Sequence, residues 1–333
     1  MIVLCPKFFG HNGQEETGRK MKNKKMGGAA VGAGGKVLKF LKKNSIGYLF
    51  IMPVLIGMAW FTFYPMISSF IFSFLEYDMI NPAKFIGLKN YIRAFTLDWD
   101  EVGNSLGVTA IYAVASITID IVLSFLLAVA LNRKVRGIRL LRTLYYLPVL
   151  IPAVVSSIIW VNLFDVEFGL ANAILNAFGL PSYTWFSDGK SSMITLLFTG
   201  LFGLGGSLML WISALNSIDT QYYEYAETEG ANSFVKLIKI TIPLCTPTFF
   251  YKLITGIIAA LQNFTVSYVL SNSRAVTDDS LLFFAVNIYN KAFHQYRMGY
   301  ASALSWILFV IIAALTLLVF RSQKKWVFYG EDN

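Results

Sequence analysis

Six long apolar segments, separated by shorter polar ones, occupy most of this chain of 333 residues. About 20 consecutive apolar residues are enough for a helix to cross the hydrocarbon core of a bilayer. Charged residues make up only 14% of the chain, against roughly 25% in a typical soluble domain. The sequence therefore predicts an all-α, polytopic membrane protein with six transmembrane helices. The expected spans are Ile46–Leu75, Ser105–Leu131, Leu144–Phe164, Ser192–Leu215, Thr248–Leu270 and Tyr300–Phe320.

The polar segments complete the expected organisation. Residues 1–45 form a basic, glycine-rich tail whose composition favours disorder. Residues 46–104 hold the first span and an external segment, and residues 105–320 hold a five-helix core. Within that core, residues 216–246 form a charged segment between two spans, and residues 321–333 form a short C-terminal tail. Pro148 and Pro152 interrupt the third span, which membrane helices tolerate when neighbours satisfy the freed backbone groups.

Lys and Arg are unevenly shared between the segments that flank the spans. Starting from the N-terminal tail, alternate segments carry 20 of these residues and the intervening ones carry 7. Cytoplasmic loops carry the excess of Lys and Arg. Both termini and residues 216–246 are therefore expected in the cytoplasm. The net charge of +9 reports this topology rather than nucleic-acid binding.

The sequence offers no pattern for a cofactor, a metal or catalysis. Cys5 and Cys245 are far apart, and so are His11 and His294, which gives neither a disulfide framework nor metal-ligand spacing. The tail segment "GAGGK" lacks the first glycine and the final Ser or Thr of a phosphate-binding loop. We therefore expect a non-catalytic protein that binds no metal or cofactor.

One acid stands inside a span. Asp120 lies near the middle of the second span, and Lys252 lies within the fifth. A carboxylate there costs about 2.5–3.5 kcal/mol on insertion scales and usually faces a bundle interior or a polar cavity. Two interpretations stay open: Asp120 contacts a transported solute or proton, or it is a packing residue bonded to another helix. The spans hold no second acid or His, which disfavours a proton relay.

The charged segment "EYAETEGANSFVKLIKITIPL" (Glu224–Leu244) reads as two short helices. Asp219 or Thr220 is a suitable N-cap for the first, and Gly230 is expected to turn the chain. In the second, Phe234, Leu237, Ile238 and Thr241 recur at helical spacing and should share one face. The first helix combines an apolar side with an acidic side, which suits a groove on a basic soluble partner.

The same segment carries a recognisable motif. The pattern Glu-x-Ala-x-x-x-Gly, nine residues, Ile-x-x-Pro is met by Glu224, Ala226, Gly230, Ile240 and Pro243, with Glu229 and Ala231 flanking the glycine. It resembles the EAA loop of binding-protein-dependent ABC importer permeases, although Tyr225 replaces the usual alanine. The stretches "FIGLKNY", "LYYLPVLIPAVVSSIIW", "WFSD", "ITIPLCTPT" and "RMGYASALSW" resemble the carbohydrate branch, which includes maltose-transporter-type permeases.

The resemblance covers about Ile46 to Phe328 and implies a type I ABC importer permease fold. It also implies the partners, which are a second homologous permease subunit, two cytoplasmic ATPase subunits and an extracytoplasmic solute-binding protein. ATP and Mg²⁺ would be bound by the ATPases. The EAA loop would be the coupling helix, with Glu224 pairing to a basic ATPase residue and Gly230 forming the turn. The implied location is the cytoplasmic membrane of a bacterium or archaeon.

A sugar, in particular an oligosaccharide, is the implied substrate. The resemblance aligns Asn263 with a sugar-contacting amide and suggests Thr199 and Gly203 in the fourth span. Gln262 and Ser267 are added on their chemistry, although such polar residues in membrane helices also bond other helices.

Three alternatives remain. An ABC permease for a non-sugar solute would not need the sugar-branch motifs. A secondary transporter requires inverted repeats and paired intramembrane charges. Asp120 is the one residue that fits this requirement. An integral membrane enzyme needs a cluster of His, Asp or Cys at the membrane edge, which the sequence does not offer.

Overall fold

The structure is a computed structural model that describes residues 45–132, 136–271 and 279–329. The expected basic tail, apart from residue 45, lies outside the described residues. Contacts divide the chain into two units, one ending at Tyr64 and one beginning at Pro65. Each unit is described by itself.

The first unit contributes a long helix that continues into the second. Helix α2 (Ser45–Met58) leads into a π-turn, η1 (Ala59–Phe63), and then into α3 (Tyr64–Phe72). Pro65 has no N–H to donate, and just before it the Tyr64 amide bonds back to Ala59, five residues earlier. The stretch Leu49–Phe72 is long and apolar enough to cross a membrane, and none of its 18 most apolar consecutive residues is buried.

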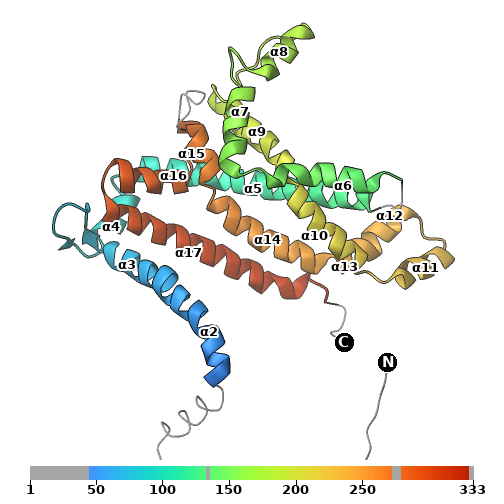
Figure 1. Ribbon diagram of the computed structural model, residues 1–333, viewed down its shortest axis with the longest axis horizontal. Coiled ribbons are helices and arrows are strands. Elements are labelled where there is room, and N and C mark those ends of the chain that lie inside the picture. The colour runs from blue at the N-terminus through green and yellow to red at the C-terminus, as the bar shows by residue number, and fades with distance from the viewer. Residues whose placement is uncertain (1–44, 133–135, 272–278, 330–333) are drawn as a thin grey trace, which may run out of the picture. The chain divides into compact units, whose positions relative to one another are not determined.

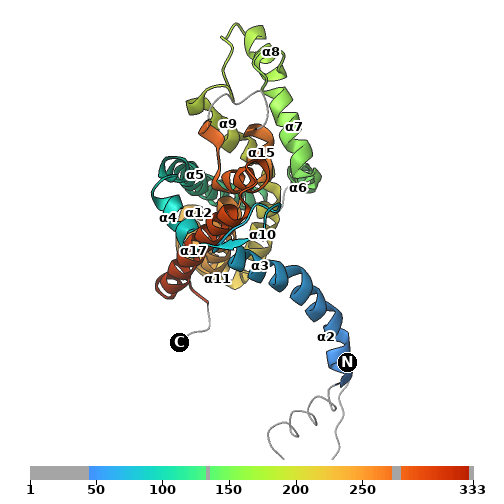
Figure 2. The same ribbon diagram turned by 90° about the vertical axis from the view of Figure 1, so that its left-hand side faces the viewer.

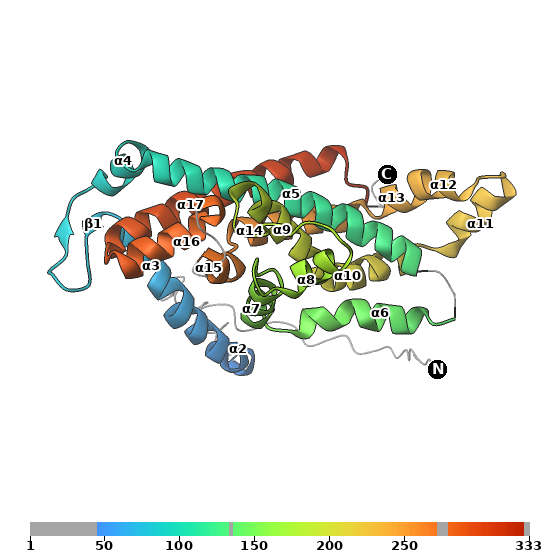
Figure 3. The same ribbon diagram turned by 90° about the horizontal axis from the view of Figure 1, so that it is seen from above.

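The second unit is built around one long helix. Helix α5 (Trp99–Leu131) has 33 residues and packs against α10 (Gly205–Asn216) and α14 (Thr246–Leu261). Helix α17 (Met298–Ser322) packs along α14, so that α5, α14 and α17 run side by side (Figures 1 and 3). The helices are held by buried apolar clusters, of which one joins α5, α14 and α17 and another joins α5, α10 and the start of α14.

Two of the expected spans are broken helices. Helix α6 (Ile138–Tyr146) continues into η2 (Leu147–Leu150) and then bends by 96° into α7 (Ala153–Leu163). Helix α9 (Gly189–Gly200) and η3 (Leu201–Gly203) bend by 50° into α10. Among the described residues, four helices are long and apolar enough to span a membrane, and the two bent pairs raise the number to six. The six-span, all-α prediction is therefore confirmed.

The third span, expected as Leu144–Phe164, needs correction. Its helix begins earlier, at Ile138, and stops at Leu150 because Ile151 adopts an extended conformation ahead of Pro152. A residue before proline is driven out of the helical region by a clash with the proline ring, so the bend is built into the sequence. The fifth span also continues past a short break, from α14 into α15 (Thr265–Ser271).

Short elements join these helices. A two-stranded antiparallel ribbon pairs β1 with β2, with Leu75 opposite Phe85. The segments α7 and α8 project from the bundle, while α4 and α11 lie at its opposite ends (Figures 1 and 2). The remaining elements are β1 (Leu75–Glu76), β2 (Lys84–Phe85), α4 (Lys89–Phe95), α8 (Leu170–Ala177), α11 (Thr220–Thr228), α12 (Ser233–Lys236), η4 (Leu237–Thr241), α13 (Ile242–Leu244), η5 (Asp279–Leu281), α16 (Phe284–Tyr289), η6 (Asn290–His294) and η7 (Gln323–Lys325).

The two broken helices touch where both are interrupted. Gly205, the first residue of α10, lies so close to the end of α6 that a Cβ at this position would be 2.2 Å from the Tyr145 carbonyl oxygen. Only glycine permits this approach of two backbones. The contact therefore fixes the position of one bend against the other.

This contact can be tested with neighbouring glycines. Gly205→Ala forces α6 and α10 apart, and such overpacking typically costs about 1–3 kcal/mol. Its melting temperature in detergent should therefore fall. Gly206→Ala is the matched control, because the nearest atom to its Cβ would be Val149 Cγ1 at 4.0 Å. Equal melting temperatures for the two variants would contradict the close contact.

Candidate functional site

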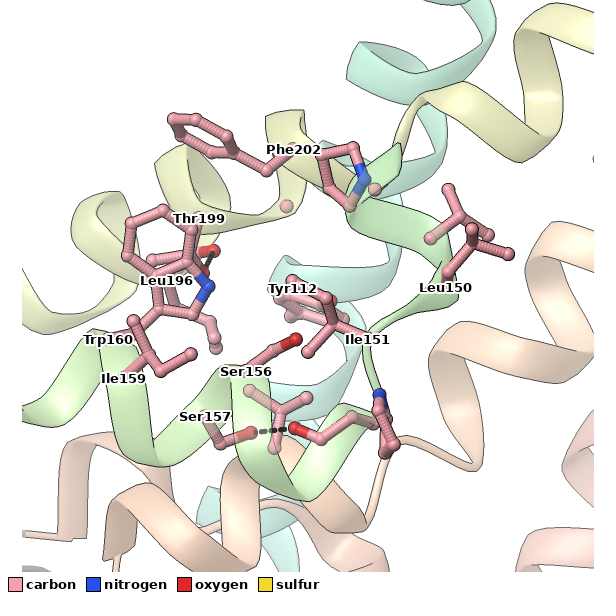
Figure 4. Close-up of a pocket in the computed structure, with 17 residues that line it drawn as sticks. Tyr112, Leu150, Ile151, Ser156, Ser157, Ile159, Trp160, Leu196, Thr199 and Phe202 are labelled. Atoms are coloured by element: carbon pink, nitrogen blue, oxygen red, sulfur yellow. Dashed lines mark hydrogen bonds between the residues drawn. The ribbon is translucent and has the colours of Figure 1, made fainter. Parts of the chain in front are cut away.

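A cavity of about 680 Å³ lies where the two broken helices meet. The break between η2 and α7 forms one wall, and the end of α9 with η3 forms the other (Figure 4). Non-helical backbone at membrane depth is tolerated where it is buried in protein or lines a cavity. The lining residues are Tyr112, Pro148, Val149, Leu150, Ile151, Pro152, Ala153, Ser156, Ser157, Ile159, Trp160, Leu196, Thr199, Gly200, Phe202, Gly203 and Val266.

Aromatic rings form one side of this cavity. The Trp160 and Phe202 rings lie close together, with centroids 4.7 Å apart, and come from the two different walls (Figure 4). Behind them, Phe164 stacks on Trp160 at 5.7 Å. Tyr112 adds a third ring from α5, packed edge-on against Phe283. These rings offer flat apolar surfaces to a ligand.

The polar side-chain groups of the cavity are hydroxyls and the indole N–H of Trp160, and none of its 17 described lining residues has a charged side chain. The Thr199 hydroxyl donates to the Leu196 carbonyl at 2.7 Å, and the Ser157 hydroxyl donates to the Ala153 carbonyl at 2.7 Å. Each of these hydroxyl oxygens still has lone pairs that can accept from a ligand. The cavity therefore suits an uncharged ligand with both apolar faces and hydroxyls.

The structure brings some of the expected substrate residues to the cavity and leaves others away from it. Thr199 and Gly203 line it. Asn263 does not, although its side chain interacts with the hydroxyl of Tyr112, which does. Gln262 ends α14 on the exposed surface, and Ser267 is fully buried within α15.

Trp160, Phe202 and Tyr112 were missed by the sequence interpretation. The signal for Trp160 was present, because Pro148 and Pro152 indicate a broken helix shortly before it, and such breaks line cavities in membrane proteins. Tyr112 and Phe202 carry no comparable local signal, because their place in the cavity depends on how distant helices pack.

The second candidate site is the segment Thr220–Leu244, hereafter the α11–α13 segment, which extends beyond the end of the bundle (Figure 1). Asp219 caps its first helix by accepting from the Gln221 amide at 3.0 Å, as expected. Gly230 has φ +75°, and two backbone hydrogen bonds close the turn. The Gly230 amide donates to the Glu227 carbonyl, and the Ala231 amide donates to the Ala226 carbonyl. This is a Schellman motif, which requires a left-handed residue at that position.

Polar contacts brace the two arms of this segment. Lys236 of α12 pairs with Glu227 of α11 at 2.6 Å, and the Tyr223 hydroxyl lies 3.0 Å from that of Thr241. Asn232 caps α12 by accepting from the Val235 amide at 2.9 Å. The segment is thus an ordered unit joined to α14.

The expected single apolar face of the second helix is divided. Leu237 packs on the bundle and Thr241 is buried, whereas Phe234 is 68% exposed and Ile238 is 45% exposed. The reason is the π-turn η4, whose five-residue spacing breaks the helical repeat on which the prediction relied. In α11, Tyr225 is likewise exposed, at 70%.

The same segment also exposes its acids. Glu224, Glu227 and Glu229 are exposed, while Ala226 and Ala231 are half-buried beneath them. Ile240 and Pro243 are half-buried at the root of the segment, close to α14. The Glu227 carboxylate is already paired with Lys236. The exposed aromatic rings and the carboxylates of Glu224 and Glu229 make the segment suited to a partner with an apolar groove and basic residues.

Asp120 has a partner that the sequence interpretation did not assign. Its carboxylate lies 2.6 Å from the Lys252 ammonium of α14, and it accepts from the Ser207 hydroxyl of α10 at 2.7 Å. These contacts agree with the interpretation of Asp120 as a packing residue bonded to other helices. The pairing was missed because helix contacts between distant segments cannot be read from either residue alone.

Comparison with known proteins shows which families and structures share this sequence and architecture. Residues 120–326 match the family described as "Binding-protein-dependent transport system inner membrane component". The probable ABC transporter permease protein YesP of Bacillus subtilis (strain 168) is 35% identical over 290 residues, which cover 86% of this chain and 93% of YesP. The trehalose/maltose transport system permease protein MalF of Thermococcus litoralis is 29% identical, with 84% and 94% covered.

A solved structure has the same fold. One chain of a bacterial alginate ABC transporter, in complex with an alginate pentasaccharide-bound periplasmic protein, superposes with a TM-score of 0.78. The superposition covers 87% of this chain and 98% of that one, at 19% identity. The chain therefore has the fold of an ABC importer permease.

Proposed function

Because the chain belongs to the family of binding-protein-dependent transport system inner membrane components, we propose that it is the permease subunit of an ABC importer for a sugar, specifically an oligosaccharide. The observation that carries the sugar assignment is the uncharged cavity with its wall of aromatic rings. A sugar presents apolar ring faces that stack on aromatic side chains and hydroxyls that pair with polar groups. The name of MalF, a trehalose/maltose permease, supports the same class of substrate.

The cavity also weighs against an anionic solute. A charged solute in a water-poor site needs a compensating charge or a dense set of donors, because burying an unpaired charge is expensive. None of the described lining side chains supplies such a charge. An uncharged or weakly polar solute therefore fits better than a phosphate or an amino acid.

Transport would be driven by partner subunits. We assign ATP and Mg²⁺ to two ATPase subunits in the cytoplasm and treat this chain as non-catalytic. The α11–α13 segment is the proposed docking element, with its exposed aromatic rings entering a groove and Glu224 pairing with a basic residue. A second, homologous permease and an external solute-binding protein would complete the importer.

The proposed orientation places both termini and the α11–α13 segment in the cytoplasm of a bacterium or archaeon. The support is the asymmetry of Lys and Arg, which accumulate in the segments assigned to that side. Asp188, at the start of α9, would then face outward.

Cysteine labelling tests this orientation. In a Cys5→Ser background, the remaining thiol is Cys245, which is buried and whose pKa is raised by burial to about 11. Since the thiolate is the reactive form, Cys245 should stay nearly silent. A membrane-impermeant maleimide added to intact cells should label Asp188→Cys but not Thr228→Cys, both of which replace exposed residues. Labelling only Thr228→Cys would reverse the orientation.

Docking through the α11–α13 segment is tested at its turn. Gly230→Val places a β-branched residue at φ +75°, although no atom lies within 4 Å of the new Cβ. The turn should deform, and the ATPase that co-purifies with the complex should fall at least fivefold. Gly137→Val is the matched control, with φ +85° and equal space, in a different loop. It should change co-purification less than twofold. Full co-purification with Gly230→Val would contradict the docking proposal.

The substrate assignment is tested at the cavity wall. Cells expressing the complete transporter should take up at least one of labelled maltose, maltotriose or trehalose with saturation. Phe202→Ala removes a cavity ring, and its uptake should fall about threefold to tenfold, since an aromatic contact is worth about 0.5–1.5 kcal/mol beyond the area it buries. Phe198→Ala is the control: it lies on α9, is 48% exposed against 46% for Phe202, and does not line the cavity. Saturable uptake of an anionic solute instead would contradict the sugar assignment.

A further inference from the structure

Three polar side chains meet within the helix bundle and form a closed cluster. Lys252 of α14 lies 2.6 Å from the Asp120 carboxylate of α5 and donates to the Ser207 hydroxyl of α10 at 2.6 Å. Ser207 in turn donates to the second carboxylate oxygen of Asp120 at 2.7 Å. The side chains are 14% exposed for Lys252 and 29% for Asp120. Each member of this ion-pair cluster thus touches both others, and each comes from a different helix.

The same three helices are joined again one turn away. The Trp211 indole of α10 donates to the Ser124 hydroxyl of α5 at 2.8 Å. Its ring packs on Phe249 of α14 and Phe125 of α5, with centroids 4.5 Å and 5.2 Å away. The ion-pair cluster and this aromatic contact therefore tie α5, α10 and α14 together at two adjacent levels.

The helices in this joint lead to the two candidate sites. Helix α14 begins directly after the α11–α13 segment, and Lys252 stands in its second turn. Helix α10 begins directly after η3, which carries Phe202 and Gly203 of the cavity wall. Ser207 stands four positions after Gly203. The ion-pair cluster therefore connects the helix that follows the α11–α13 segment to the helix that follows the cavity wall.

A charge pair constrains this joint more than apolar packing would. Separating the helices would leave an ammonium and a carboxylate without partners in a medium of low dielectric constant, which is strongly unfavourable. Two apolar side chains of similar volume could slide past each other and are often equally stable. A partly buried pair at this position therefore restricts how these three helices can move relative to one another.

From this geometry we propose that Asp120 and Lys252 are positioning residues, which transmit movement of the α11–α13 segment to the cavity wall through Ser207. The inference rests on the proposed importer function and deepens it. It also assigns a role to Asp120 that requires neither solute contact nor proton transfer.

The test uses the assembled complex with cysteine-free partner subunits, in lipid nanodiscs. The reporter is Phe202→Cys in the Cys5→Ser background, and the measurement is its maleimide labelling rate without nucleotide and with ATP plus vanadate. In the background complex the two rates should differ at least threefold. In Asp120→Asn/Lys252→Met, which removes both charges and keeps the volume, they should agree within 1.5-fold, while the ATPase still co-purifies and the melting temperature is unchanged.

A matched control pair lies on the same long helix. Glu101 of α5 pairs with Lys291 of η6, also at 2.6 Å, and the Lys291 side chain is 5% exposed. This pair has no contact with the α11–α13 segment, so Glu101→Gln/Lys291→Met should keep the threefold nucleotide response. The Glu101 side chain is 41% exposed. Loss of the response in this control as well would overturn the inference, because an ion pair elsewhere on α5 would then have the same effect.

Two outcomes separate this inference from the function on which it rests. A full nucleotide response in Asp120→Asn/Lys252→Met would overturn the inference alone. No response in the background complex would overturn the importer proposal and the inference with it.

If the double variant does not assemble, Ser207→Ala decides, because it leaves the charges paired and removes only their link to α10. Its response should fall by at least half, and an unchanged response would overturn the inference.

Discussion

The requirement that every backbone polar group be paired within a membrane governs the rest of this structure. Irregular backbone is tolerated there only where protein or a cavity covers it. The chain breaks two of its spans, at Ile151–Pro152 and after Gly203, and it brings both breaks to one place. The close approach of Gly205 to the Tyr145 carbonyl joins them. The cavity is therefore a direct product of where the helices are interrupted.

Much of the architecture could be predicted from the sequence because apolar length and local turn chemistry are local properties. The six spans, the Asp219 cap and the turn at Gly230 all depend on residues within a few positions of one another. The prolines of the third span indicated that its helix is interrupted. They did not indicate the 96° angle of the bend, since an angle depends on what the two halves pack against.

The candidate site was predicted only in part, for a related reason. Thr199 and Gly203 reach the cavity, but the rings that shape it come from helices far apart in the chain. Asp120 and Lys252 were each visible inside an apolar span, yet their pairing depends on the register of α5 against α14. The divided face of Phe234 and Leu237 was unpredictable from helical spacing, because a π-turn changes that spacing.

The π-turn η4 sets the angular phase between the α11–α13 segment and the bundle. Its hydrogen bonds join residues five apart where those of an α-helix join residues four apart, and each residue added to or removed from a helix rotates everything beyond it by about 100°. Removing one residue from 237–239 would therefore leave Glu224, Ala226 and Gly230 unaltered but turn them to a different direction relative to Ile240 and Pro243. The length of η4 thus sets the direction in which the exposed side chains of α11 point, whatever those side chains are.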